Sequence, residues 1–387
     1  MSRLLLFILF FTAIFLQAGA YGLTFMLPRL FAAFGANEKT VGAMLFVTTV
    51  STLITVYFSG HLADRFGRVH TLGLACAAIA VALLLYGRSQ SAGPALVGAS
   101  LLLGMGWGLT YSLAPVVLTR LVGTEERVRF FALLSVFVMA GFGLSPVMAA
   151  AIEDAGFAVS DAFVINAALC AVSALLFFAL VGPVREHSRA AGVEARSRLT
   201  LSSVGSILGS TALVPVVMVC LGASVFAGIN NFQTVFADAR GLDYSVYFLA
   251  YTVTVIVFRL LLVGFRGGSS PYLTIAGLQY VMCASVALFI FMGGDKTLYI
   301  LFAILFGIGY GASYPILAAM AANDAAEGLM PQTLQLFALT YFVGIFGFPL
   351  IAGWLIVETG PMPLLVLVGA LAGIEATMAA RRARARA

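Results

Sequence analysis

Long apolar runs separated by short polar turns are the dominant pattern of this 387-residue chain. A helix needs about 20 apolar residues to cross the hydrocarbon core of a bilayer. Twelve runs are long enough. We predict spans at residues 4–34, 40–62, 70–87, 95–120, 130–152, 160–183, 207–236, 245–265, 272–293, 297–320, 332–356 and 361–380.

One connection is longer than the others. Residues 183–203 are rich in Arg, Ser, Ala and Glu, and they divide the chain near its midpoint. We therefore expect a six-helix bundle at 1–183, a cytoplasmic linker at 184–206, and a second six-helix bundle at 207–387 that ends in a basic tail.

Basic side chains are unevenly divided between the two sides that these spans define. With the N-terminus inside, 16 of the 21 Lys and Arg residues fall on the inner side and 5 on the outer side. This bias follows the positive-inside rule, so we expect both termini in the cytoplasm, in a cell inner membrane. The first run continues to Phe34, which is too long for the apolar region of a cleaved signal peptide.

Composition supports the membrane assignment and excludes other classes. Hydrophobic residues make up 62% of the chain and charged residues 10%, against about 25% charged in a soluble domain. A nucleic-acid-binding surface would need polar faces that this sequence lacks. The four cysteines lie inside apolar runs and the three histidines lie at loops. We therefore expect no disulfide framework, no metal, no cofactor and no enzymatic activity.

The two halves of the chain repeat. Gly104, Gly106, Gly108, Thr110 and Tyr111 in the fourth run recur 203 residues later in the tenth. Their counterparts are Gly307, Gly309, Gly311, Ser313 and Tyr314, and the same offset relates Gly141 to Gly344 and Pro146 to Pro349. Because each half has six spans, matching helices have the same orientation, as in a parallel repeat of two bundles. Glycines at these positions let helix backbones approach closely.

The turn between the second and third runs carries the most specific motif. Residues Gly60–Arg68 read Gly-His-Leu-Ala-Asp-Arg-Phe-Gly-Arg. Gly60 and Gly67 are expected to allow the sharp turn, and Arg65 and Arg68 to hold it in the cytoplasm. Asp64 places a carboxylate at the bilayer edge, where a partner is expected.

This motif resembles the loop between the second and third helices of the major facilitator superfamily. The resemblance implies twelve helices in two bundles that open a central site to each side in turn. It also implies a conformational latch on the cytoplasmic face, formed by Gly60, Asp64, Arg65, Gly67, Arg68 and, from the loop after the fourth helix, Arg127. The alternative is ordinary solvated charges, each pair of which contributes about 0–1 kcal/mol.

The fifth run resembles the antiporter motif of the same superfamily. It contains Gly141, then Ser145-Pro146 and Ala149-Ala150, where Ser145, Ala149 and Ala150 replace three glycines of the family pattern. All the replacements are small, and Pro146 should bend the helix. In the family this motif marks exporters, so we expect export.

Polar residues inside the helices are the candidates for substrate contact, because the resemblance implies a cavity lined by the first, fourth, seventh and tenth helices. Gln17, Tyr21 and Thr24 share one helical face. The full set is Gln17, Tyr21, Thr24, Thr110, Tyr111, Asn230, Asn231, Gln233, Arg259, Ser313 and Tyr314. Hydrogen bonds between helices would satisfy these groups equally well. Arg29 is expected to extend to the headgroups, and Arg259 to bind an anion or to pair with Asp324 or Glu327.

Proton coupling normally needs an acidic group or a histidine at membrane depth. We expect no acidic residue deep in a helix, because Asp64, Asp324, Glu327 and Glu375 all lie toward cytoplasmic ends. Coupling could use Asp64 or Asp238, could be carried by a charged substrate, or could be absent.

The sequence therefore predicts a secondary transporter, monomeric in the bilayer, that exports a small organic solute, with protons as one candidate coupling ion. Two alternatives stay open at this stage. One is an uptake permease for a small organic anion, and the other is a membrane scaffold with a transporter-like fold and no flux.

Overall fold

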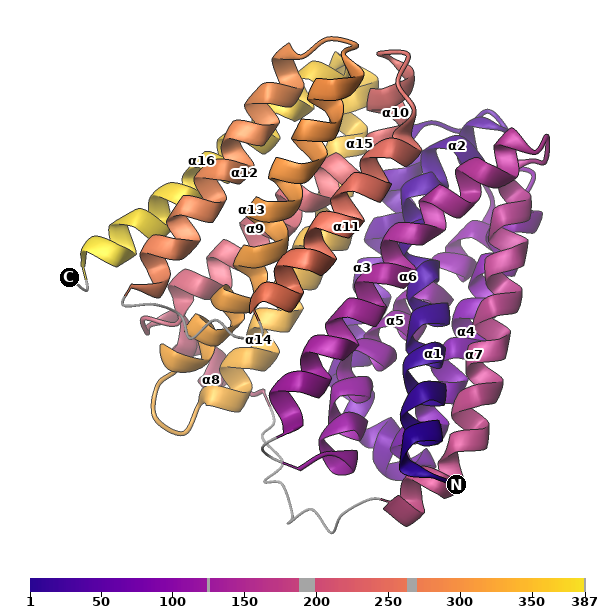
Figure 1. Ribbon diagram of the computed structural model, residues 1–387, viewed down its shortest axis with the longest axis vertical. Coiled ribbons are helices and arrows are strands. Elements are labelled where there is room, and N and C mark those ends of the chain that lie inside the picture. The colour runs from indigo at the N-terminus through magenta and orange to yellow at the C-terminus, as the bar shows by residue number, and fades with distance from the viewer. Residues whose placement is uncertain (124–125, 188–198, 263–269, 386–387) are drawn as a thin grey trace. The chain divides into compact units, whose positions relative to one another are not determined.

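The computed structural model describes residues 1–123, 126–187, 199–262 and 270–385, and within these ranges it contains helices and no strands (Figure 1). Twelve helical segments are long and apolar enough to cross a membrane, each close to a predicted span. The all-α, twelve-span prediction is therefore confirmed. The chain divides into two compact units, Met1–Val193 (unit 1) and Glu194–Ala387 (unit 2).

Unit 1 contains six spans. The first is formed by three consecutive pieces, and the other five are single helices. Their bounds are α1 (Arg3–Gly22), η1 (Leu23–Met26), α2 (Leu27–Ala32), α3 (Glu38–Phe66), α4 (Arg68–Arg88), α5 (Pro94–Leu121), α6 (Arg127–Asp154) and α7 (Val159–His187).

Unit 2 also contains six spans. Their elements are α8 (Leu201–Leu208), α9 (Leu213–Asn230), α10 (Gln233–Asp238), α11 (Tyr244–Leu262), α12 (Pro271–Phe291), α13 (Lys296–Asn323), α14 (Met330–Phe342), η3 (Val343–Gly347), α15 (Phe348–Thr359) and α16 (Pro361–Arg384). Of the predicted linker, residues 184–187 end α7, residues 188–198 lie outside the described part, and Leu201–Leu208 form α8. The exact division into bundles and linker stays a prediction.

Two spans are interrupted near a proline. Pro28 has no N–H for the carbonyl of Thr24, and that oxygen instead accepts from the amide of Leu27, so the backbone tightens into the 3₁₀ turn η1. In unit 2 the π-helical turn η3 lies just before Pro349. Its counterpart Pro146 lies inside the unbroken helix α6, where Leu144 occupies the position of Gly347. A glycine makes such loosening easier.

Glycines in α5 and α13 bring these helices against equivalent neighbours in the two units. A Cβ on Gly106 would lie 2.7 Å from the carbonyl oxygen of Ala75, and one on Gly309 would lie 2.8 Å from that of Leu278. Both the glycines and the oxygens that they face are separated by 203 residues. The same spacing relates the other neighbours of these glycine series: Thr48, Thr52 and Ile79 in unit 1 correspond to Tyr251, Val255 and Met282 in unit 2.

Glycines also bring the fifth span against the first span in each unit, but here the sequence offset between the matching contacts differs slightly. A Cβ on Gly141 would meet the carbonyl oxygen of Phe15, and one on Gly344 would lie 2.6 Å from that of Cys220. The glycines are again 203 residues apart, whereas Phe15 and Cys220 are 205 apart. The internal repeat read from the sequence is thus also a repeat of helix-to-helix contacts.

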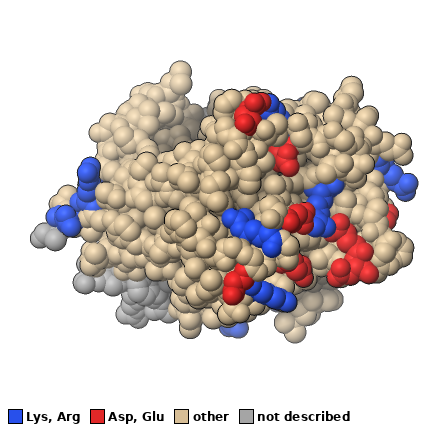
Figure 2. Space-filling view, turned by 90° about the horizontal axis from the view of Figure 1, so that it is seen from above, with Lys and Arg blue, Asp and Glu red and all other residues tan. Residues whose placement is uncertain are grey.

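The surface is suited to lipid. Large apolar side chains are exposed along the spans, among them Ile54, Leu175 and Val366. Figure 2 shows Lys, Arg, Asp and Glu in scattered groups on the end that it views, surrounded by wide areas without charge. A soluble protein would seldom expose so much apolar surface.

Candidate functional site

A charged pocket lies at one end of unit 1, where four helices begin or end. It has a volume of about 410 Å³, and its lining includes Asp64 of α3, Arg68 of α4, Arg120 of α5 and Arg185 of α7. Asp64 and Arg185 are exposed, whereas Arg68 and Arg120 are half-buried. Three guanidinium groups therefore share this open pocket with one carboxylate, an arrangement in which ion pairs are weak and readily exchanged.

Gly67 creates the turn that brings Asp64 and Arg68 to this pocket. Its φ of +84° lies in a region that side chains with a Cβ rarely adopt. Its amide caps α3 by donating to Ala63, and its carbonyl accepts from the amide of Thr71 in α4. Gly60, in contrast, lies inside α3, so the expectation that it forms part of the turn is wrong.

Alanine substitution should separate the roles of these two glycines. Neither would bring a Cβ within 4 Å of another residue, so only backbone conformation differs. We expect Gly67→Ala to lower the free energy of unfolding by about 1–3 kcal/mol. Gly60→Ala should raise stability by up to about 1 kcal/mol, because alanine favours a helix interior. Thermal unfolding of the two variants in detergent checks this, and equal effects would contradict it.

Two other residues of the predicted latch lie elsewhere. The guanidinium of Arg65 lies 5.5 Å from the ring centre of Phe66 and is exposed. Arg127 is the first residue of α6, and its side chain lies outside the described part. Near it, Arg3 pairs with Glu126, which ties the start of α1 to the residue before α6.

The predicted polar face of the first span is buried in unit 1. Gln17, Tyr21 and Thr24 are each 2% exposed. The Thr24 hydroxyl donates to the carbonyl of Tyr21 at 2.7 Å, and Gln17 Oε1 has no hydrogen-bond partner among the described residues. Asn166 of α7 has a similarly unpartnered Oδ1, and sequence reasoning missed it.

A stacked aromatic pair joins the first and fourth spans in both units. In unit 1 the rings of Tyr21 and Trp107 lie 5.0 Å apart at 21°. In unit 2 the rings of Phe226 and Tyr310 lie 4.6 Å apart at 20°. The partners are related by the offsets of 205 and 203 residues found for the glycine contacts. Sequence reasoning singled out Tyr111 and Tyr314 from the repeated segment and missed Trp107 and Tyr310.

The amides predicted on the seventh span bond within unit 2. Gln233 donates to the Tyr299 hydroxyl at 2.6 Å, and Asn230 accepts from the Tyr247 hydroxyl at 3.3 Å. Asn231 donates to the carbonyl of Ala227. Hydrogen bonds between helices thus engage Asn230 and the amide nitrogen of Gln233, whereas Gln233 Oε1 is buried with no hydrogen-bond partner among the described residues.

The remaining cavity candidates lie on α5, α11 and α13. The hydroxyls of Thr110 and Ser313 donate to backbone carbonyls of their own helices. Tyr111 is half-buried, and Tyr314 packs its ring 5.8 Å from Phe337. Arg259 is half-buried near the end of α11.

Arginines at other helix ends have protein partners. Arg29, which was expected to extend to the headgroups, forms an ion pair with Glu153 of α6 at 3.0 Å. Arg240, in the loop after α10, lies 4.6 Å above the ring of Phe289. Burial lowers the pKa of Arg240 from its ordinary value.

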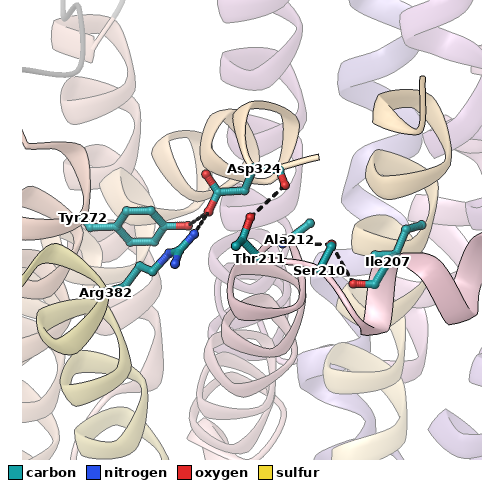
Figure 3. Close-up of polar contacts among 7 residues, drawn as sticks. All are labelled: Ile207, Ser210, Thr211, Ala212, Tyr272, Asp324 and Arg382. Carbon is teal, nitrogen blue, oxygen red and sulfur yellow. Dashed lines mark hydrogen bonds and ion pairs between the residues drawn. The ribbon is translucent and has the colours of Figure 1, made fainter. Parts of the chain in front are cut away.

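A second polar cluster, at the end of α13 in unit 2, was not foreseen (Figure 3). Asp324 has a fully buried carboxylate, which accepts from the Tyr272 hydroxyl at 2.8 Å and pairs with Arg382 at 3.2 Å. The Thr211 hydroxyl donates to the Asp324 backbone carbonyl at 3.2 Å. The sequence offered Asp324 as a partner of Arg259, and it did not foresee the ion pair of Asp324 with Arg382 in the basic tail of α16.

Glu375 also differs from the sequence-based expectation. It is 2% exposed on α16, and it accepts a hydrogen bond from Gln279 of α12. A Cβ on Gly222, the tenth of the 18 residues of α9, would lie 2.9 Å from each carboxyl oxygen. The carboxyl group thus faces the middle of a span, and the expectation of no acidic group deep in a helix is wrong.

Comparison with known proteins agrees with this architecture. Residues 9–349 match the family model of the Major Facilitator Superfamily. A probable 4-methylmuconolactone transporter of Cupriavidus pinatubonensis (strain JMP 134 / LMG 1197) is 30% identical over 121 residues. That alignment covers 31% of this chain and 27% of the relative, so the greater part of both proteins lies outside it.

Solved structures share the fold at low identity. The nucleoside transporter NupG matches with a TM-score of 0.75 at 14% identity, covering 97% of this chain and 99% of that one. The proton:xylose symporter XylE matches with a TM-score of 0.68 at 12% identity, over 96% and 94% of the two chains. The human organic anion transporter MFSD10 matches at 0.66 and 14%, over 98% and 100%. From its family model, its twelve spans and its fold, this chain belongs to the Major Facilitator Superfamily of membrane transporters.

Proposed function

We propose that this transporter carries a small organic solute out of the cell across the inner membrane by alternating access, as a monomer with both termini in the cytoplasm. The observation that carries the proposal is the repeated contact pattern. Each unit uses glycines at matching positions to pack its fourth span on its second and third spans. Two bundles built alike are what alternating access about a central site requires.

The solute class is proposed from the charge of the candidate residues. Among the cavity candidates only Arg259 carries a charge, and the others are amides, hydroxyls and aromatic rings. These groups suit an uncharged or weakly charged organic molecule. The partial relative named for 4-methylmuconolactone makes that compound a first probe, and because this lactone retains one carboxylate it also tests the organic-anion alternative.

Export and the latch are proposed from the two motifs. The antiporter-like segment of α6 favours export, and Gly141 there packs directly against α1. In the latch, Asp64 exchanges partners among Arg68, Arg120 and Arg185 as the cytoplasmic end opens and closes. Pairs of about 0–1 kcal/mol each can break during every cycle.

Counterflow in proteoliposomes tests the function. Vesicles are loaded with unlabelled 4-methylmuconolactone or a member of a panel of small organic acids, lactones and aromatic compounds, and the labelled compound is added outside. A carrier that alternates predicts transient accumulation of label. With the cytoplasmic face outward, proton-coupled export also predicts accumulation when the lumen is acidic. Absence of counterflow across the panel would contradict the proposal and favour a membrane scaffold with a transporter-like fold and no flux.

A second candidate, uptake of a small organic anion, is favoured by Arg259, which is half-buried within a span. If it holds the anion, Arg259→Ala should lower anion flux about tenfold or more, because a charge-assisted hydrogen bond is lost. Arg259→Lys should retain part of that flux. The favoured account instead expects both variants to carry uncharged solutes as well as the parent does, measured in the same vesicles.

A further inference from the structure

The pairing of Glu375 with Gln279 leaves two oxygens without partners. Gln279 is fully buried, and its amide nitrogen donates to Glu375 Oε1. Glu375 Oε2 and Gln279 Oε1 are both buried, and neither has a hydrogen-bond partner among the described residues. A buried polar atom left unpaired is costly, so this pair is incomplete if Glu375 is a carboxylate.

Among the residues that the structure describes, the helices around Glu375 offer no cation at its depth. The helices packed against α16 are α9, α12 and α15. Within α9 and α12, both described from end to end, there is no Lys, Arg, His, Asp or other Glu. The ionisable side chains of all four helices, besides Glu375 itself, are Cys220 on α9, Tyr272, Tyr280 and Cys283 on α12, Glu358 on α15, and Arg381, Arg382 and Arg384 on α16.

None of the three arginines of α16 serves as a partner of Glu375. Arg382 pairs with Asp324, and Arg381 and Arg384 are exposed in the last turns, beyond the apolar part of the span. A lone carboxylate at this depth would be expensive. A neutral carboxylic acid has an O–H that can donate to Gln279 Oε1. Acid and amide would then form two hydrogen bonds, and both oxygens would be satisfied.

The corresponding interface of unit 1 packs without an acidic residue at this position, so the fold does not require Glu375 for packing. At the matching α4–α7 interface the buried pair is Cys76 and Ser173, with 3.4 Å between sulfur and hydroxyl. Gln279 lies 203 residues after Cys76, and Glu375 lies 202 residues after Ser173. Two small neutral groups pack this interface in unit 1, and Ser173 lies 2.7 Å from the Ala13 carbonyl oxygen.

We propose that Glu375 is the proton-binding site of this transporter, a neutral acid paired with Gln279 in the packed state that releases its proton during the transport cycle. The inference rests on the proposed transport function. When α9 and α16 separate enough to admit water, the O–H bond of Glu375 breaks and the proton passes to a water molecule. The carboxylate that remains keeps the Gln279 amide as a donor. Reprotonation from the other side of the membrane restores the pair.

Gly222 is what allows the carboxyl group to occupy its place, because any side chain there would contact both of its oxygens. The proposal therefore also predicts that Gly222→Ala perturbs the acid, whereas Gly205→Ala, at an open position on α8, does not.

Infrared difference spectroscopy on the reconstituted full-length protein tests the protonation state without any solute. The C=O stretch of a protonated carboxylic acid should appear at low pH and disappear as pH rises. It should be absent from Glu375→Gln, shifted in Gly222→Ala, and retained in Ser173→Ala, the matched variant of unit 1. No band lost in Glu375→Gln, or a band that persists at every pH at which the protein stays folded, would overturn the proposal.

Transport in the same vesicles supplies the second readout, with labelled 4-methylmuconolactone or the panel member that the parent protein carries. Glu375→Gln resembles the neutral acid, so we expect it to lose accumulation driven by a pH gradient while solute exchange remains measurable. Ser173→Ala should keep both. Full gradient-driven accumulation in Glu375→Gln would overturn the proposal. Failure of the parent protein to carry any solute would instead count against the transport function, and the infrared result would still stand.

Discussion

Replacing Gly22 with alanine should destabilise unit 1 by about 3 kcal/mol or more, the upper range for an overpacked interior. Gly22 ends α1 where this helix contacts α6. A Cβ there would overlap the carbonyl oxygen of Phe142 and the hydroxyl of Ser145. A backbone carbonyl cannot turn aside as a long side chain can, so the two helices must move apart. In lipid this loss is serious, because close packing is a main attraction between helices.

The matched control is Gly98→Ala. Gly98 lies in α5, and a Cβ there would meet nothing within 4 Å. Its substitution should leave stability unchanged or slightly improved, since alanine favours helices. Unfolding in detergent, followed by circular dichroism and by tryptophan emission, compares the two variants. Equal melting temperatures would show that the α1–α6 contact is looser than described.

Replacing Arg382 with alanine should cost unit 2 about 3–5 kcal/mol, the range for removing one partner of a buried ion pair. The Asp324 carboxylate is fully buried, and Arg382 supplies its paired charge. Without Arg382 the carboxylate would keep the Tyr272 hydroxyl but lose the paired charge that Arg382 supplies. Asp324 directly follows the last turn of α13, where the negative end of the helix dipole further destabilises an unpaired carboxylate.

Arg381 provides the control for charge alone. It is the preceding residue on α16 and is exposed. Arg381→Ala removes the same charge from the same tail and should change stability by less than about 1 kcal/mol. Asp324→Asn combined with Arg382→Ala should recover part of the loss, because no buried charge is then left alone. If both arginine variants melt alike, the cluster of Figure 3 contributes little.

The spans were predictable because a bilayer imposes one simple condition on the sequence. Backbone groups in lipid must bond within the segment, so an apolar run of sufficient length becomes a helix. The 3₁₀ turn η1 before Pro28 likewise follows from the missing N–H of this proline. Gly60 shows the limit of this reasoning: a glycine near a turn was assigned to the turn, but α3 continues through it, and Gly67 alone has a positive φ there.

Contacts across long sequence separations were harder to predict. Asp324 meets Tyr272 and Arg382, which are 52 and 58 residues away. Glu375 meets Gln279 at a separation of 96. Hydropathy shows that each helix is buried but not which faces meet. The sequence placed Glu375 toward the cytoplasmic end of its span, whereas the packing of α16 on α9 places it opposite Gly222.

The internal repeat could have revealed more than it did. The repeated segment contains Trp107 and Tyr310 between its glycines, and both proved to stack on the first span of their units. Their partners Tyr21 and Phe226 are 205 residues apart rather than 203, so a search at one fixed offset does not align them. A difference of two residues between spans is enough to conceal such a pair in the sequence.

The central claim is that both halves of this transporter present matching ends to the same side of the membrane. Single cysteines at four exposed positions, in a protein whose native cysteines are replaced, test it most directly with a reagent that does not cross the bilayer. Arg65→Cys and Arg381→Cys should be labelled only from the cytoplasmic side, and Ser91→Cys and Lys296→Cys only from the outer side. Labelling of positions 65 and 381 from opposite sides would contradict the parallel repeat and the transport mechanism based on it.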